Sequence, residues 1–467
     1  MRRPVAGLLV LYVPFYEKIV PLREEKIKFS EEVRGKLAEH CDLVFPGLIE
    51  TEEQAAAAAG SFESADLVIV VPSLAVFGAL GWAALEPLNK PVAVWAIQPA
   101  TAIPEGYDIC ELIRNSGALG VQALANTLAR HERMYATFFS AGDATVPHRL
   151  IRFARVAATA RDLRRATFGQ IGSVFPQMTD IRMDHDGWTA QTGSCIVEIS
   201  SKDFTRRYRA QSESQAAARV AEIRGGHTVA EITGDELDRS ARISLALDEV
   251  VDEFGLAGGA FNCHGENCLQ NPEIGVTGCY AVSRQSSAGR PFSCTGDLPT
   301  AIALFIAKSL GGAAVYGELD LVDPAAGLVL LANGGEGDFT AAAGPTDIIG
   351  NENFTGLHGR GASIGMRMAP GPATILSFTP VDAARAYRMV TAEGELLPLS
   401  SPRLGVFHGA FRFCGLSAAV GFESWCDAGA THHLALMPGH WNEEIGILCR
   451  MLGFEHVRAG GPHASER

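Results

Sequence analysis

The stretch FSCTGDLPTAIALFIAKSLGGAAVYGELDLVD, residues 292–323, shows a strand, a helix and a second strand in succession. Within residues 298–312, apolar residues recur at i, i+3, i+4 and i+7 and glycines follow, which predicts a helix that ends at the glycines. The segment VYGELDLVD, residues 315–323, is a predicted strand whose tail carries carboxylates. This alternation indicates an α/β domain with acidic groups at a strand end.

Three further segments place polar chemistry in otherwise apolar sequence. They are FNCHGEN at residues 261–267, LLANGGEGDF at 330–339 and AGATHH at 428–433. Oxygen and imidazole donors brought together from separate strand ends are what a hard or borderline divalent cation requires, and the same groups can move protons on a bound substrate. The series therefore predicts a metal-dependent enzyme that acts on a small, polyol-like molecule.

The first third of the chain alternates short apolar runs with helical patterns. GLLVLYV (7–13), ADLVIVVPS (65–73) and PVAVWAIQ (91–98) are predicted strands, and residues 30–40 and 51–62 are predicted helices. Fully apolar strands between amphipathic helices indicate a parallel sheet covered on both faces. No Gly-x-Gly turn follows the first strand, which argues against a nicotinamide dinucleotide.

These patterns predict three domains. Residues 1–165 form a doubly wound, Rossmann-like α/β domain, and its last helix, 147–165, bridges to the next domain. Residues 166–343 form a second Rossmann-like domain that carries most of the active site. In residues 344–467, short strands rich in glycine and proline predict an antiparallel β-barrel or sandwich with a terminal helix at 441–454.

Composition narrows the functional classes. The formal charge of −14 argues against nucleic acid as a main partner, since phosphate binding requires a basic surface. The ten cysteines show no small-scaffold spacing and are expected to be reduced thiols of a cytoplasmic protein. The apolar run near the N-terminus suits a buried strand better than a signal peptide, and no run reaches the ~20 residues of a membrane span.

The ordered series resembles the L-fucose isomerase and L-arabinose isomerase superfamily of aldose–ketose isomerases. Two more segments, FGQIGSVFPQMTD (168–180) and GPATILSFTP (371–380), resemble the family's opening of the second domain and its barrel strand. The resemblance implies a divalent cation, most plausibly Mn²⁺, and a small sugar or sugar derivative as substrate. It also implies a trimer-based homo-oligomer, such as a hexamer, with sites between subunits.

The resemblance also assigns roles to residues. Glu266 matches a catalytic glutamate of the arabinose-isomerase branch and is a possible metal ligand, and Glu318 lies where the family presents a metal-binding acid. The pair His432 and His433 resembles the family's paired histidines, of which His433 is the expected ligand and His432 a substrate-binding group. Asn333 resembles the residue that family members place beside the metal.

Three candidates rest on weaker patterns. Met178 and Asp180 resemble a Gly-Met-x-Asp turn of the family, with Gln177 in place of the glycine. Gln98 follows a predicted strand of the first domain and is expected at an edge that completes a neighbouring subunit's site. For Asp180 the alternative is a turn cap, and for Gln98 a solvent-facing amide. Asp320 and Asp323 are alternatives to Glu318, because one gap in the match to the family would shift the register.

One departure from the family concerns the reaction. Where family members carry a catalytic glutamate in Glu-x-Asp, this chain has Thr295, followed by Gly296 and Asp297. Threonine does not titrate near neutral pH, so it cannot carry a proton as a carboxylate does. Asp297 is a candidate substitute, because residues two apart on a strand point the same way. Alternatively, the substrate needs only one base, or the protein binds a sugar without turnover.

The cysteines of CHGENC suggest a second metal hypothesis. Cys263, His264 and Cys268, with Cys279 or Cys294, offer zinc donors, but Cys-x4-Cys has no matching partner pair. These cysteines are instead expected to be buried free thiols. The leading prediction is a metal-dependent sugar isomerase that works through an enediolate. The alternatives are another metal-dependent lyase or epimerase on a polyhydroxylated substrate and a catalytically silent sugar-binding protein.

Overall fold

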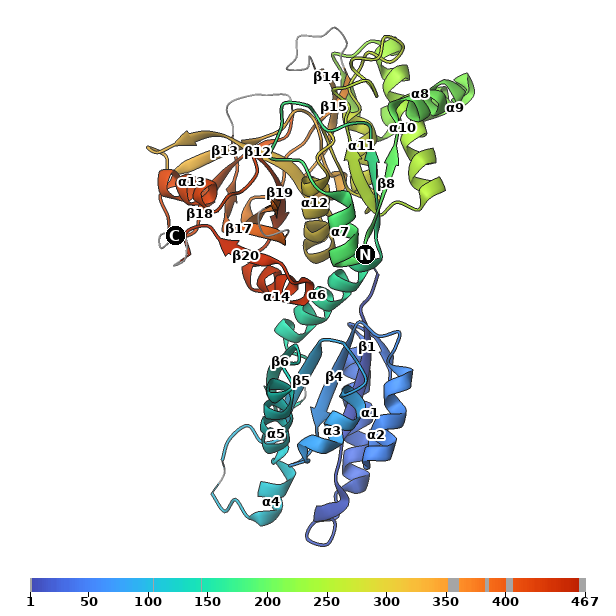
Figure 1. The fold of residues 1–467 in the computed structure, drawn as a ribbon. Helices are drawn as coiled ribbons and strands as arrows, with labels where there is room; N and C mark the ends of the chain where they lie inside the picture. The colour runs from blue at the N-terminus through green and yellow to red at the C-terminus, as the bar shows by residue number, and fades with distance from the viewer. Residues whose placement is uncertain are drawn as a thin grey trace. The chain divides into compact units, whose positions relative to one another are not determined.

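The computed structural model divides into two compact units, residues 2–161 and 162–467, and each is described by itself (Figure 1). Helix α6 (His148–Arg165) contains the division. The structure describes residues 2–103, 105–143, 145–351, 361–382, 386–399 and 406–461. No helix in these ranges is long and apolar enough to span a membrane.

The first unit is a parallel sheet with helices on its faces, as its apolar strands predict. The sheet order is β2-β1-β4-β5-β6, and β3 also pairs with β1. The strands are β1 (Val5–Leu11), β2 (Asp42–Val44), β3 (Leu48–Ile49), β4 (Leu67–Pro72), β5 (Val92–Gln98) and β6 (Tyr135–Ala141). The helices are η1 (Pro14–Tyr16), α1 (Arg23–Ala38), α2 (Glu52–Ser61), α3 (Gly78–Leu85), α4 (Ile109–Arg114) and α5 (Gly117–Arg130).

Helix α1 begins earlier than the sequence pattern predicts. The pattern places a cap at Ser30, whereas the helix starts at Arg23. A carboxylate oxygen of Glu17 accepts hydrogen bonds from the backbone N–H groups of Leu22 and Arg23, both at 2.9 Å. Ser30 instead donates its hydroxyl to the Ile27 carbonyl inside the helix. Glu17 therefore supplies the acceptor that the pattern assigned to serine.

The second unit opens with a smaller parallel sheet in the order β11-β10-β7-β8. Its strands are β7 (Thr167–Ile171), β8 (Cys195–Ile199), β10 (Gly258–Phe261) and β11 (Phe292–Ser293). Helices α7 (His185–Thr192), α8 (Ser201–Ala210), α9 (Glu213–Gly226), α10 (Gly234–Phe254) and α11 (Cys279–Ser287) surround it. A Cβ at Gly259 would lie 2.3 Å from the Gly169 carbonyl oxygen, so this strand contact requires glycine.

The remaining strands of this unit close an antiparallel barrel. The order β16-β19-β12-β13-β18-β17 returns to its start because β16 also pairs with β17, and β20 joins β17 in parallel. The strands are β12 (Val315–Asp323), β13 (Leu328–Ala332), β16 (Gly371–Val381), β17 (Ala386–Leu397), β18 (His408–Phe413), β19 (His433–Pro438) and β20 (Glu455–Arg458). Thus β12 and β13 belong to the barrel, although they precede the domain boundary expected at residue 344.

Helix α12 (Leu298–Gly311) connects the sheet to the barrel. It contacts β10 and β11 as well as the barrel strands β16 and β19, and residues 298–308 are all buried. The expected amphipathic helix is therefore enclosed on every face, which fixes the position of its N-terminus. The unit also contains η2 (Phe339–Ala341), α13 (Ala418–Asp427), α14 (Asn442–Leu452) and a small sheet of β9 (Thr228–Ala230), β14 (Asp347–Asn351) and β15 (Gly361–Gly365).

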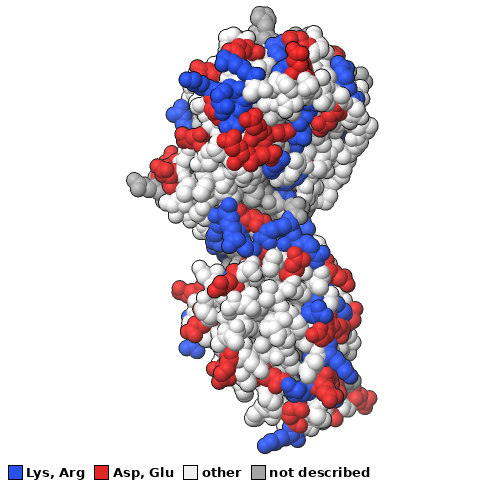
Figure 2. Space-filling model, turned by 90° about the vertical axis from the view of Figure 1, so that its right-hand side faces the viewer, with Lys and Arg blue, Asp and Glu red and all other residues white. Residues whose placement is uncertain are grey.

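Charged side chains of both signs are scattered among uncharged residues on the surface that Figure 2 shows. On the face shown in Figure 2, acidic and basic groups lie intermixed over both units. Many charged groups are paired: the exposed Arg206, for example, bonds Asp203 at 2.6 Å.

Candidate active site

A cavity of about 450 Å³ lies inside the second unit, where the barrel meets the carboxyl ends of the parallel strands. Its volume is within the ~300–1,000 Å³ range of small-molecule sites. We call the side formed by Tyr316, Glu318, Asp320, His432 and His433 the barrel wall. We call the side formed by Phe175, Met178, His264, Cys294 and Thr295 the strand-end wall.

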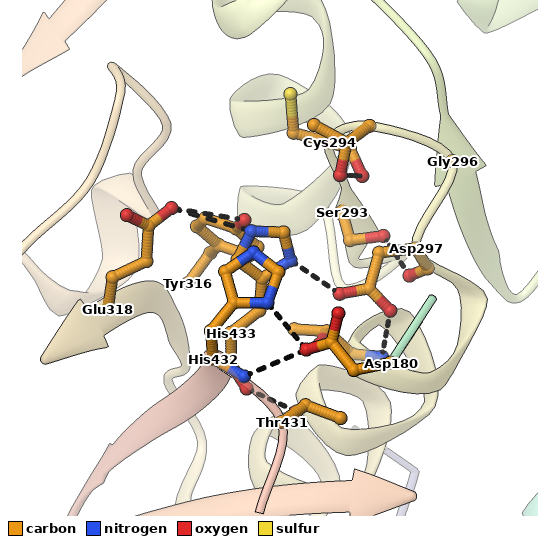
Figure 3. A network of polar contacts seen from close by, with 12 residues as sticks. Asp180, Ser293, Cys294, Gly296, Asp297, Tyr316, Glu318, Thr431, His432 and His433 are labelled. Carbon is orange, nitrogen blue, oxygen red and sulfur yellow. Dashed lines mark hydrogen bonds and ion pairs between the residues drawn. The ribbon is translucent and has the colours of Figure 1, made fainter. Parts of the chain in front are cut away.

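The barrel wall brings Glu318 and His433 together through strand register. The two residues are direct partners on the antiparallel strands β12 and β19. His433 Nε2 lies 3.5 Å from Glu318 Oε1, and the Tyr316 ring packs 4.8 Å from the imidazole, centroid to centroid (Figure 3). Two donors this close can converge on one cation.

Asp297 fixes the orientation of His433. Its Oδ2 is 2.7 Å from His433 Nδ1, and its Oδ1 accepts a hydrogen bond from Thr300 N at 2.9 Å as the N-cap of α12 (Figure 3). Asp297 is fully buried and does not line the cavity. Because Nδ1 faces this carboxylate, Nε2 is left to face the cavity, as in metal sites where a carboxylate orients a ligand histidine.

The neighbouring histidine has its own carboxylate. Asp180 Oδ2 lies 2.6 Å from His432 Nδ1 and accepts the His432 backbone N–H at 3.2 Å. Burial alone would raise the pKa of Asp180, but the hydrogen bonds from His432 outweigh it and hold that pKa below its usual value. The expected turn residue Asp180 therefore positions His432, whose ring lies 3.8 Å from that of His433.

Asp320 enters the cavity through an irregularity in β12. The pairing of β12 with β13 shifts between Leu319 and Leu321, which leaves Asp320 as an extra residue. Such bulges re-aim side chains and are common beside active sites. Asp320 remains exposed on one side, but its partial burial, reinforced by the nearby Glu318, raises its pKa to about 6.

Glu336 is a carboxylate of the cavity that the sequence patterns missed. Its side chain is 5% exposed, and neither oxygen accepts a hydrogen bond from a nitrogen or oxygen donor within the described residues. Burial raises its pKa well above the usual value, and the Cys294 thiol opposes this only in part. Asn333 shapes this loop, because its amide donates to the carbonyls of Tyr316 and Glu336 at 2.7 and 2.9 Å.

Thr295 lines the cavity with a strained backbone. Its φ is +54°, in the left-handed region that β-branched residues avoid. Its hydroxyl donates to the Cys294 carbonyl at 2.8 Å, and its own carbonyl accepts Phe175 N–H at 3.0 Å. Thr295, at the position where the resemblance predicts a glutamate, therefore lies at the cavity, on the strand-end wall.

The strand-end wall also gathers sulfur and imidazole groups. Cys263 Sγ and Cys294 Sγ are 3.1 Å apart, and the donor atoms of Cys263, His264 and Cys294 all lie within 4.8 Å of one another. The hydrogen bond from Cys294 is the main cause of a lowered pKa at Cys263, and the charge of Cys263 raises the pKa of His264.

Two sequence candidates lie elsewhere. Glu266 is exposed in the loop after β10 and does not line this cavity. Gln98 ends β5 in the first unit, where its side chain donates to the Ala100 carbonyl at 2.7 Å. Met178, by contrast, lines the cavity.

The chain is similar to known sugar isomerases. Residues 320–455 match the family model of the L-arabinose isomerase C-terminal domain. Sulfoquinovose isomerases of Priestia aryabhattai and Priestia megaterium are each 21% identical over 374 residues, which cover 79% of this chain and 80% of theirs. The matched domain includes Asp320, His432 and His433. These matches support the assignment of the chain as a divergent member of the L-fucose isomerase and L-arabinose isomerase superfamily of sugar isomerases.

Proposed function

We propose that this protein is a metal-dependent aldose–ketose isomerase that moves a hydrogen between adjacent carbons of an open-chain sugar through an enediolate. The observation that carries the proposal is the cross-strand pair of Glu318 and His433, with Asp297 behind the imidazole. A carboxylate and an oriented imidazole that face a small-molecule cavity are the groups that such chemistry requires.

The donors present fit a divalent cation such as Mn²⁺. Glu318 offers oxygen and His433 offers nitrogen, the mixture that borderline hard cations accept. When bound there, such a cation supplies positive charge that stabilises the developing enediolate. The buried Asp297 supports the fit, because its carboxylate leaves His433 Nε2 directed toward Glu318.

Proton transfer falls to carboxyl groups that line the cavity. Thr295 has no carboxyl, Glu266 is outside the cavity, and Asp297 is engaged by His433 and the helix cap. Asp320 and Glu336 line the same cavity as Glu318. We assign the two proton-transfer roles to this pair and a positioning role to Asp297.

The cavity favours an uncharged sugar. No lysine or arginine is among the described residues that line it, and Phe175 and Met178 give one side apolar character. A sulfonate or phosphate is usually recognised by lysine or arginine. The relatives named as sulfoquinovose isomerases make a sulfonated sugar the second candidate, which requires a cation from outside the described lining.

The test is hydrogen exchange in heavy water. Metal-free protein is reloaded with Mn²⁺ and incubated with neutral aldoses, their deoxy forms and sulfoquinovose, and the metal is removed before proton spectra are recorded. Deuterium next to the carbonyl together with a new ketose supports the proposal, and the substrate that exchanges fastest decides between the two candidates. Binding of a sugar without exchange would support the silent binding protein, and other products would support a lyase or epimerase.

The assembly and the location of the protein remain predictions. The family resemblance predicts a trimer-based homo-oligomer, and the reduced thiols predict a cytoplasmic protein. Light scattering on the purified chain measures the first, and fractionation of cells that produce it measures the second.

A further inference from the structure

The carboxyl ends of β10 and β11 place three soft donors side by side. The two strands are parallel neighbours, with Ala260 opposite Ser293, so the residues that follow them emerge at one edge. Cys263 and His264 come from the first strand end and Cys294 from the second. Their donor atoms lie within 4.8 Å of one another, which is close enough to surround a single ion after small side-chain movements.

The donor types select a different metal from the one at the barrel wall. Two cysteines and one histidine suit Zn²⁺, which binds thiolate sulfur at ~2.3 Å and imidazole nitrogen at ~2.0 Å. Mn²⁺ prefers oxygen ligands. Three protein ligands leave one tetrahedral position open, as in zinc sites that also bind water or substrate. His264 and Cys294 both line the cavity, so the open position faces it.

An independent observation comes from Glu336. It is more than nine-tenths buried, it lines the same cavity, and within the described residues neither of its oxygens accepts a hydrogen bond from a nitrogen or oxygen donor. Burying a carboxyl group in this way is costly unless a cation or a donor is added. Water bound to a zinc ion beside Cys294 would supply such a donor.

We propose that Cys263, His264 and Cys294 form a second metal site, a Zn²⁺ site of the Cys2His type whose fourth position opens into the cavity beside Glu336. The sequence pattern disfavoured zinc because it paired Cys263 with Cys268. Cys268 is buried nearby but does not belong to the group. The proposal does not depend on isomerase activity.

The first experiment uses the unmodified protein. Mn²⁺ in excess fills the oxygen-rich site, one equivalent of Zn²⁺ is added under reducing conditions, and zinc X-ray absorption is recorded. Two sulfur neighbours at ~2.3 Å are expected. A shell of only oxygen and nitrogen would overturn the proposal, as would a failure to retain zinc after dialysis. A thiol count that falls by two without reductant and is not protected by zinc would instead indicate a Cys263–Cys294 disulfide.

Variants then identify the ligands. Co²⁺ in place of Zn²⁺ gives a thiolate charge-transfer absorption, which should disappear in Cys263→Ala and Cys294→Ala and remain in the matched control Cys268→Ala. Circular dichroism checks that each variant is folded. Equal absorption in all three variants would overturn the assignment. Because this readout is spectroscopic, a protein without isomerase activity that shows the absorption disproves only the proposed function, and an active isomerase without it disproves only the zinc site.

Discussion

The two walls of the cavity are built in different ways. On the barrel wall, antiparallel register places Glu318 opposite His433, and each histidine is held by a carboxylate, the buried Asp297 for His433 and the exposed Asp180 for His432. On the strand-end wall, residues follow the ends of short parallel strands, and Thr295 has a left-handed backbone. The barrel wall presents carboxylate and imidazole donors whose orientation is fixed by hydrogen bonds. The strand-end wall presents thiols and a residue with a strained backbone. The two walls therefore offer different donor atoms to the same cavity, oxygen and imidazole on one side and thiols with an imidazole on the other.

The largest effect is expected from Glu318→Gln. The amide keeps the size of the side chain but loses the negative charge that faces His433. We expect Mn²⁺ binding to be lost and activity to fall by at least ~10²-fold, the usual effect of removing one electrostatic contact to a transition state. Calorimetry measures Mn²⁺ binding, and the hydrogen-exchange assay measures activity. The matched control is Glu395→Gln, a half-exposed barrel residue, which should change neither. Unchanged metal affinity in Glu318→Gln would remove the barrel wall from the mechanism.

The next largest effect is expected from Asp297→Asn, which tests whether Asp297 orients the imidazole of His433. In Asp297→Asn, the side-chain oxygen can still cap α12, because asparagine caps helices as well as aspartate does. The negative partner of His433 Nδ1 is lost, so Mn²⁺ affinity should fall ~10–100-fold, as for other groups that orient metal ligands.

The control for this variant is Asp108→Asn, which changes the N-cap of α4 in the first unit without a histidine nearby. It should leave metal affinity unchanged. If Asp297→Asn binds Mn²⁺ normally but loses proton exchange, Asp297 acts in catalysis itself, as one sequence hypothesis held. The two readouts thus separate positioning from proton transfer.

The sequence indicated the framework better than the site. Continuous apolar runs identified the strands β1, β4 and β5, and apolar residues at helical spacing identified α12. Burial of these elements on both faces requires such apolar sequences. The extra barrel strands β12 and β13 were assigned to the preceding domain, since strand pairing between residues ~100 apart in the chain leaves no local signal. The pairing of β12 with β19 is such a long-range contact.

Glu336 shows why site residues were harder to identify. It lies in a glycine-rich loop, LANGGEGDF, and such loops usually carry exposed acids. Its burial depends on Asn333, which pins the loop to Tyr316. Glu266 shows the opposite case: motif position suggested a site residue, whereas the loop after β10 leaves its side chain exposed. For Glu336, the available sequence signal was a carboxylate between two glycines, shortly after a strand.

The stability of the barrel is expected to depend on pH, which affects the interpretation of activity measured in acid. His456 on β20 contacts Thr391 of β17 at 2.9 Å, and burial, with Arg458 and Arg450 nearby, lowers its pKa from 6.5 to about 4. The unfolded chain therefore binds a proton between these values while the folded chain does not, so stability should decline as pH falls from 6.5 to 4. The loss should be on the order of 1–3 kcal/mol.

Urea unfolding at pH 7 and pH 5 measures this effect, and His456→Gln, which retains a polar partner for Thr391, should reduce the difference. A difference of the same size in His456→Gln would assign the acid sensitivity to other groups. Activity lost in the same pH range should then be attributed to the cavity only to the extent that the barrel remains folded.

The smallest effect concerns strain at Thr295. Glycine adopts positive φ freely, so Thr295→Gly should gain ~1–2 kcal/mol from relieved strain and lose ~0.5–1 kcal/mol to backbone entropy. We expect a small net stabilisation in urea unfolding. Gly296→Ala next to it is the matched control and should destabilise, because its φ is +78° and a Cβ would lie 2.8 Å from the Ser173 carbonyl oxygen.

Thr295→Glu tests whether a glutamate at this position of the strand-end wall increases isomerase activity. If this residue alone limits the reaction, Thr295→Glu should raise isomerase activity while Thr295→Gly does not. If both variants leave the rate unchanged, the proton is moved by other groups of the cavity, and divergence at Thr295 carries no catalytic cost. A stabilised Thr295→Gly protein with lower activity would show instead that the strained threonine contacts the substrate, because strain that persists at a functional site is usually tied to its role.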